Sequence, residues 1–224
     1  MNWQAIALSL RLAASVSGIL LIAGMPIAYW ITFSRWRWKF LVEAVVALPL
    51  ILPPTVLGYY ILVGLGPRTF PGRLWQACFG STLPFTFGGL LVASVLYSLP
   101  FAVQPFSAAF GAVDRSLIEA SWTLGSSRLA TFLRVILPLS TAGAVTGTVL
   151  TFAHTVGEFG VVLMVGGNIP GVTRTVSIDI YDQFQAAHYD VANRTALLLL
   201  AFSFVVLSII YGTNRRAFSL RQQQ

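Results

Sequence analysis

The sequence contains very little charge for a chain of its length. Only 9% of its 224 residues are Asp, Glu, Lys or Arg, whereas 56% are hydrophobic and the mean hydropathy is +0.78. A soluble domain is roughly 25% charged, because its surface must be solvated by water. The scarcity of charge therefore excludes a water-soluble globular protein and predicts an integral membrane protein that contacts lipid.

Metal-binding and catalytic side chains are also scarce. Cys78 is the only cysteine, so no disulfide can form within the chain, and the two histidines are far apart. No cluster has the ligand spacing of a metal site, and no nucleophile stands beside a base. Lys39 is the only lysine, and no phosphate-binding P-loop surrounds it. We therefore expect no metal site, no membrane-embedded enzyme and no ATPase site within this chain.

Five apolar stretches are long enough to cross a bilayer, which takes about 20 helical residues. Backbone groups inside hydrocarbon must bond to one another, so the stretches are predicted to be helices and the fold all-α. The first is too long for the apolar region of a cleaved signal peptide, about 7–15 residues, and we expect it to be retained. The five predicted spans are residues 5–33, 40–65, 88–112, 139–165 and 193–213, followed by a short tail at 214–224.

Basic residues lie mainly on one side of the predicted membrane. The positive-inside rule places the richer side in the cytoplasm, so the N-terminus is predicted outside and the C-terminus inside. Clusters at helix ends fit anchoring at the lipid surface and do not fit nucleic-acid binding. The richer side holds Arg35, Arg37, Lys39, Arg115, Arg128, Arg134, Arg215, Arg216 and Arg221, and the other side holds Arg11, Arg68, Arg73, Arg174 and Arg194.

The second predicted span contains three prolines, Pro49, Pro53 and Pro54, followed by Thr55. Each proline removes an amide donor and clashes with the carbonyl one turn back, so this helix must be kinked or broken. Two interpretations are open: a packing kink, or a helix that lines a pathway and bends during gating. The neutral hydroxyls of Thr55 and of Thr151, in the fourth span, are candidate pathway groups, because weak, transient hydrogen bonds suit a conduit.

The connection at residues 114–138 differs from the others because charged residues alternate with regularly spaced apolar ones. The spacing of three and four predicts amphipathic helix, and Gly125 interrupts it, so two short helices joined at a turn are expected. Two acidic residues and a glycine turn are unsuited to a helix that lies on anionic lipid. We therefore interpret this segment as a docking element for another protein.

The same segment carries a family resemblance. The run Glu119-Ala120-Ser121-Trp122-Thr123-Leu124-Gly125-Ser126-Ser127-Arg128 and the closing Leu137-Pro138 resemble the cytoplasmic signature loop of type I ABC importer (MetI-like) permeases, which usually have alanine at the position of Ser121. The resemblance covers residues 5–211. It implies that Glu119, Ala120, Gly125, Arg128, Leu137 and Pro138 couple this chain to an ATPase.

The resemblance also implies partners and a location. It implies a homodimer in the bacterial cytoplasmic membrane, in contact with lipid, that works by alternating access. Two separate ATPase subunits would bind ATP and Mg at the cytoplasmic face, and a periplasmic oxyanion-binding protein would deliver the substrate. The outer loop, with Asn168, Pro170, Gly171 and Arg174, is expected to form a short helix that helps to dock this partner.

Three segments indicate the substrate by resemblance. Residues 48–59 and 167–175 resemble molybdate permeases, and residues 157–160 resemble a segment shared by molybdate and sulfate permeases. Molybdate is therefore predicted, with tungstate and sulfate or thiosulfate as alternatives. A secondary anion transporter that needs no ATPase is the alternative from another class; it predicts internal repeats, and no clear repeat is visible.

Two ionisable residues lie within the fourth predicted span. His154 and Glu158 stand four residues apart and would share one face of a continuous helix. Buried charges persist when they are paired, so we expect a structural role in which Glu158 bonds to His154, to backbone or to an arginine. A proton-coupled role is the alternative.

Overall fold

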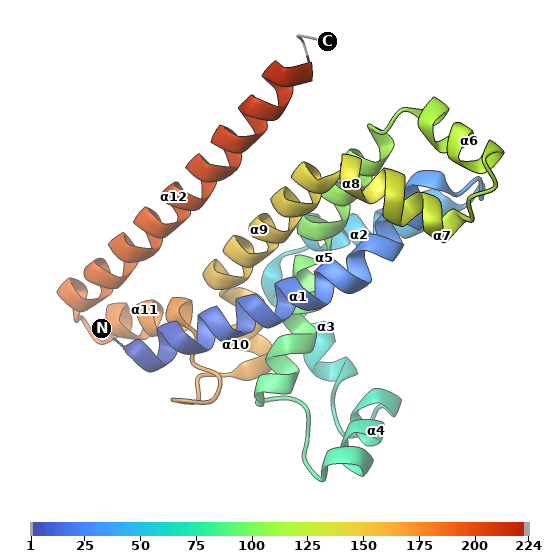
Figure 1. Cartoon of the computed structure of the whole chain (residues 1–224). Coiled ribbons are helices and arrows are strands. Elements are labelled where there is room, and N and C mark those ends of the chain that lie inside the picture. Colours follow the sequence, from blue (N-terminus) through green and yellow to red (C-terminus); the bar gives the residue numbers. More distant parts are fainter. Residues whose placement is uncertain (1, 222–224) are drawn as a thin grey trace.

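The computed structural model describes residues 2–221, with side chains described for residues 2–209 and 212. All regular elements within this range are helical, which confirms the predicted all-α fold (Figure 1). The helices are α1 (Trp3–Phe33), α2 (Lys39–Ile51), α3 (Pro54–Gly64), α4 (Phe70–Phe79), α5 (Phe87–Gly111), α6 (Arg115–Thr123), α7 (Arg128–Thr131), α8 (Leu137–Leu139), α9 (Thr141–Gly157), α10 (Gly160–Gly166), α11 (Val176–Gln185) and α12 (Tyr189–Arg221). A π-helical turn, Phe132–Ile136, joins α7 to α8.

The core lies where α1, α5 and α9 pack against one another. Leu12 and Val16 of α1 and Phe106 of α5 are fully buried there. Gly147 of α9 allows the approach, since a Cβ at this position would lie 2.7 Å from the ring of Phe106. Small residues at helix contacts are typical of membrane proteins, because dispersion forces between closely packed helices replace the hydrophobic effect.

Within the part of the chain that the structure describes, three helices are long and apolar enough to cross a membrane without interruption: α1, α5 and the first part of α12, Tyr189–Ile209. Two bent pairs bring the number to five if each pair counts as one span. The first pair is α2 and α3, which meet at an angle of 116°, and the second is Arg128–Leu139 with α9, bent by 77°. The predicted kink or break in the second span is therefore present as a break.

The prediction of one continuous helix over residues 139–165 is wrong. The helix α9 ends at Gly157, Glu158 adopts an extended conformation with φ −66° and ψ 132°, and α10 begins only at Gly160. Glycines on both sides of the break reduce helical stability, and the composition of the run gave no other sign of the interruption. The break determines where Glu158 lies.

The last helix is longer than predicted. The fifth span was expected to end at residue 213 before a separate tail, whereas the backbone of α12 is helical from Tyr189 to Arg221. Residues 222–224 of the predicted tail, and the side chains of Arg215, Arg216 and Arg221, lie outside the described part of the chain. The start of α12 packs on α11, and the helix then diverges from the rest of the molecule (Figure 1).

Candidate translocation and coupling sites

The predicted coupling loop forms a projection at the end of the molecule opposite to α11 (Figure 1). Asp114 caps the first helix of the loop, α6, because its side chain accepts a hydrogen bond of 2.9 Å from the backbone N–H of Ser116. This bond lowers the pKa of the Asp114 carboxyl. The hydroxyls of Ser121 and Thr131 lie 3.0 Å apart and join α6 to α7. The two predicted short helices are thus present and connected to each other.

Gly125 ends α6 in a left-handed conformation with φ +83°. The N–H of Ser126 donates to the carbonyl of Ser121, and the N–H of Gly125 donates to the carbonyl of Trp122. These two bonds form a Schellman motif, in which the residue that reverses the chain needs a positive φ. Glycine adopts this conformation without steric cost, so the turn directly requires Gly125.

The projecting surface combines exposed apolar and charged side chains. Leu124 is 86% exposed and Leu129 68% exposed, while Ile118 is buried and anchors α6. Within the described residues, neither Glu119 nor Arg128 forms an ion pair, so both charges are free for a partner. Ala120 lies beside Glu119 on α6, whereas Leu137 and Pro138 begin α8, beyond the π-helical turn.

The proline-rich break places two half-length helices side by side. Pro49 is buried inside α2, Pro53 precedes α3, and Pro54 is its first residue. A Cβ on Gly160 would lie 2.7 Å from the Cβ of Pro54. Similarly, a Cβ on Gly58 would lie 2.7 Å from that of Met164. The helices α3 and α10, which are distant in sequence, therefore pack with their backbones close together.

A cavity of about 590 Å³ opens beside this contact. It brings the predicted pathway residue Thr55 together with His154 and Glu158. Thr151 does not line the cavity, since it is fully buried and its hydroxyl donates to the carbonyl of Gly147 at 2.8 Å. The lining residues are Pro54, Thr55, Tyr97, Ala153, His154, Gly157, Glu158, Phe159 and Gly160.

The predicted bond between His154 and Glu158 is absent from the described structure. The Nδ1 atom of His154 lies 3.0 Å from the hydroxyl of Ser98, and its ring stacks on Phe101 with the ring centroids 3.8 Å apart. Glu158 follows the end of α9, so the two residues no longer share a helix face. Glu158 is only 3% exposed, and its carboxyl is buried beside the hydroxyl of Ser94.

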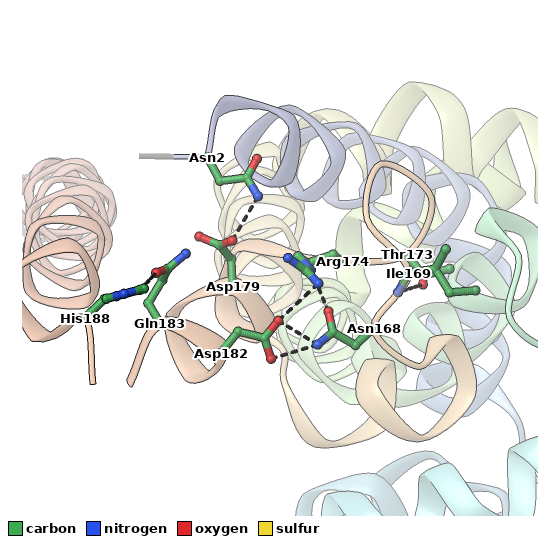
Figure 2. A network of polar contacts seen from close by, with 9 residues as sticks. All are labelled: Asn2, Asn168, Ile169, Thr173, Arg174, Asp179, Asp182, Gln183 and His188. Carbon is green, nitrogen blue, oxygen red and sulfur yellow. Dashed lines mark hydrogen bonds and ion pairs between the residues drawn. The ribbon is translucent and has the colours of Figure 1, made fainter. Parts of the chain in front are cut away.

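At the opposite end, the outer loop is held by a polar network (Figure 2). Asn168 donates to both carboxylate oxygens of Asp182, at 2.7 and 2.6 Å. Arg174 donates to the side-chain oxygen of Asn168 at 2.6 Å and lies 3.3 Å from the Asp182 carboxylate. Of the four residues predicted to dock a partner, Asn168 and Arg174 are thus engaged internally. Pro170 and Gly171 are exposed in the intervening loop, where Gly171 has φ +73°.

The sequence did not reveal how the N-terminus joins this network. The side-chain amide of Asn2 donates to Asp179 at 2.9 Å, across 177 residues, and the hydroxyl of Ser9 accepts from the N–H of Val176 at 2.8 Å (Figure 2 draws the first contact). Asp179 is 1% exposed in α11, in the expected position of a short outer helix. In the sequence, only the scarcity of acidic residues set Asp179 apart.

Comparison with known proteins identifies the family. Residues 21–223 match the model of the binding-protein-dependent transport system inner membrane component. The chain belongs to this family. It is 51% identical to the molybdenum transport system permease protein ModB of Azotobacter vinelandii, over 94% of this chain and 93% of that protein.

Two further relatives extend the comparison. The molybdenum transport system permease protein ModB of Escherichia coli (strain K12) is 36% identical over 93% of this chain and 91% of that protein. A probable sulfate transport system permease protein, cysT, of Chlorokybus atmophyticus is 31% identical over 85% of this chain and 65% of that protein. The resemblance to molybdate and sulfate permeases is thereby confirmed.

The fold has a solved counterpart. A structure of the MetNI methionine ABC transporter in an inward-facing conformation superimposes with a TM-score of 0.71 over 96% of this chain and 95% of that chain, at 16% identity. The predicted fold of a type I ABC importer transmembrane domain is therefore confirmed.

Proposed function

We propose that this chain is the permease subunit of an ATP-driven importer that moves molybdate across the bacterial cytoplasmic membrane. The observation that carries the proposal is the 51% identity, over nearly the full length, to a molybdenum transport permease. The matched region covers 94% of this chain, so it is far longer than the signature loop at residues 114–138.

The free charges and exposed apolar residues of the α6–α7 projection support a role in coupling. A separate ATPase, which binds ATP and Mg, would contact Glu119, Ala120, Gly125 and Arg128. Closure of two such subunits on nucleotide would draw two projections together and bias the permease between inward-facing and outward-facing states. Leu137 and Pro138 would transmit this motion through α8 to α9.

The assembly we propose is a homodimer with two ATPase subunits and a periplasmic oxyanion-binding protein. A closed path for an ion between identical subunits calls for a symmetric pair. The distribution of basic residues supports a periplasmic N-terminus and a cytoplasmic C-terminus. The exposed Pro170 and Gly171 would then face the binding protein, while Asn168 and Arg174 would hold the loop in shape.

A deletion strain tests the proposal. Loss of this chain should abolish molybdate uptake at low external concentration, and excess molybdate should restore growth through less selective routes. Affinity purification from the native membrane should recover an ABC ATPase in a one-to-one ratio. A transporter that is fully active without any ATPase would contradict the coupling role and favour a secondary transporter.

Sulfate is the second candidate, because a probable sulfate permease is 31% identical to this chain. If sulfate or thiosulfate is the substrate, the deletion strain will need a reduced sulfur source and will accumulate molybdenum normally. Competition by tungstate separates a molybdate and tungstate carrier from a sulfate carrier. Uptake of a cation or an organic nutrient would contradict the oxyanion assignment.

A further inference from the structure

The hairpin that joins α1 to α2 concentrates aromatic and basic side chains at one end of the molecule. Three of the six tryptophans lie within residues 30–38, and three of the 14 basic residues lie within residues 35–39. The ring centroids of Tyr29 and Phe132 are 5.3 Å apart, so the hairpin is at the same end as the α6–α7 projection (Figure 1). Because α1 and α2 both belong to candidate membrane spans, the chain between them lies at the boundary of lipid and water.

The conformation of the hairpin keeps its aromatic rings at the surface. The chain reverses in a four-residue turn, which the N–H of Lys39 closes by donating to the carbonyl of Trp36 at 3.2 Å. The ring of Trp36 also lies against that of Trp30, with the centroids 5.8 Å apart. Nevertheless Trp36 is 50% exposed and Trp38 49% exposed. Tryptophan is enriched at membrane interfaces, because its ring is apolar while its N–H can bond to headgroups or water.

Only one of the three basic side chains of the hairpin is engaged within the chain. The ammonium of Lys39 lies 3.8 Å from the carboxylate of Glu43 and donates to the carbonyl of Ile31 at 3.4 Å. Arg35 and Arg37 are exposed, and neither forms an ion pair among the described residues. A guanidinium binds phosphate well, because its planar N–H groups can donate in pairs. Two free arginines are therefore available for a phosphate beside the exposed indole rings.

We propose that the α1–α2 hairpin binds an anionic phospholipid, whose phosphate is held by Arg35 and Arg37 and whose apolar part lies beside Trp36 and Trp38. Free positive charge alone would fit any anion. Exposed indole rings next to that charge, at the edge of the membrane, fit an anion that carries an apolar tail. Glu43 is already paired with Lys39, so the remaining charge of the hairpin is positive and complements the lipid.

Brominated lipids test the contact directly. The full-length chain is placed in phosphatidylcholine vesicles that contain a minor share of either brominated phosphatidylglycerol or brominated phosphatidylcholine. Bromine quenches tryptophan fluorescence only at short range, so the anionic lipid should quench more strongly. The triple variant Trp30→Phe, Trp36→Phe, Trp38→Phe should lose this excess. Equal quenching by the two lipids, or an excess that survives in the triple variant, would overturn the proposal.

Paired arginine variants separate a lipid site from general charge. Arg35→Gln combined with Arg37→Gln should lower the relative affinity for phosphatidylglycerol roughly tenfold or more, because each basic residue near an anionic membrane contributes about fivefold. Arg68→Gln combined with Arg73→Gln is the matched control. It removes the same charge from two exposed arginines around the start of α4, far from the hairpin, and should leave the affinity within about twofold (Figure 1). Equal losses in the two double variants would overturn the site.

Other occupants would give different results. Inorganic phosphate at constant ionic strength should leave the excess quenching unchanged; if it abolishes the excess, the site takes a free anion. The double variant of Arg35 and Arg37 should still co-purify with the ATPase. If it loses the ATPase while its quenching is unchanged, the hairpin docks that protein. Either result would overturn the lipid site. The transported substrate enters none of these measurements, so their failure would leave the proposed function standing.

Discussion

The guanidinium of Arg174 lies 3.3 Å from the carboxylate of Asp182, and Asn168 bonds to both side chains (Figure 2). The three residues join the outer loop to α11. We therefore expect a substitution in this network to act on the shape of the loop. Any effect on a partner would follow from that change of shape.

We expect Asp182→Ala to destabilise the protein by about 1–2 kcal/mol. The substitution leaves the side-chain N–H groups of Asn168 without their acceptor and removes the ion pair of Arg174, which still donates to Asn168. The side chains of Arg174 and Asp182 are 24% and 26% exposed, so solvent screening keeps the loss in the lower part of the usual range. Thermal unfolding in detergent measures the loss, and hydrogen exchange at residues 169–173 shows whether the loop opens. Gln183→Ala, one position further along α11, removes only an exposed bond to His188 and should not open the loop.

Gly125→Val should uncouple transport from ATP hydrolysis while the protein still inserts into the membrane. The cost is conformational, about 1–2 kcal/mol for a left-handed non-glycine residue, because no atom lies within 4 Å of the added Cβ. Gly80→Val is the matched control: Gly80 also has a positive φ and open space, but lies at the end of α4. Uncoupling by both variants would point to general strain and contradict a specific role of the projection.

Glu119→Ala tests the proposed contact between the α6–α7 projection and the ATPase by removing the charge of Glu119. Loss of a charge-assisted hydrogen bond at a buried interface costs about 1.5–3 kcal/mol, or roughly tenfold or more in affinity for the ATPase. The variant should retain its fold, because the Glu119 side chain has no ion pair among the described residues. Co-purification of the ATPase and its transport-dependent hydrolysis are the measurements, and wild-type values of both would remove Glu119 from the contact.

Gly58→Ala should destabilise the contact between α3 and α10 by about 1–3 kcal/mol, because overpacking forces the neighbours apart. The added Cβ would lie 2.7 Å from the Cβ of Met164 and 3.2 Å from the Cα of Val161, which is backbone and cannot rotate away. Gly64→Ala, in the same helix with no atom within 4 Å, should be neutral or slightly stabilising. Thermal unfolding compares the two, and equal stabilities would contradict the close packing of these helices.

The orientation can be tested with single cysteines. Cys78 is exposed in α4, and an impermeant thiol reagent added outside intact cells should label it. In a variant without Cys78, a cysteine placed by Leu124→Cys should react only after the membrane is opened. Leu124 suits this test because it is 86% exposed and its backbone bonds survive the substitution. Labelling of Leu124→Cys from outside would reverse the predicted topology.

Much of the fold was accessible from local sequence. Scarce charge and long apolar runs required lipid-embedded helices, and the break near Pro53 followed from covalent geometry, since proline lacks an amide hydrogen wherever it stands. The turn at Gly125 followed from an interrupted helical period. These features depend on neighbours within one or two helical turns, so the linear order of residues was sufficient to predict them.

Other features depended on contacts between distant segments. The end of α9 at Gly157 places Glu158 in the cavity wall and gives His154 a partner, Ser98, that is 56 residues away. The bond from Asn2 to Asp179 spans 177 residues. Helical periodicity determined which residues could share a face, whereas close packing of α3 against α10 and of α1 against α11 decided which polar groups met. Such pairings depend on the relative positions of whole helices, and no local pattern in the chain encodes those positions.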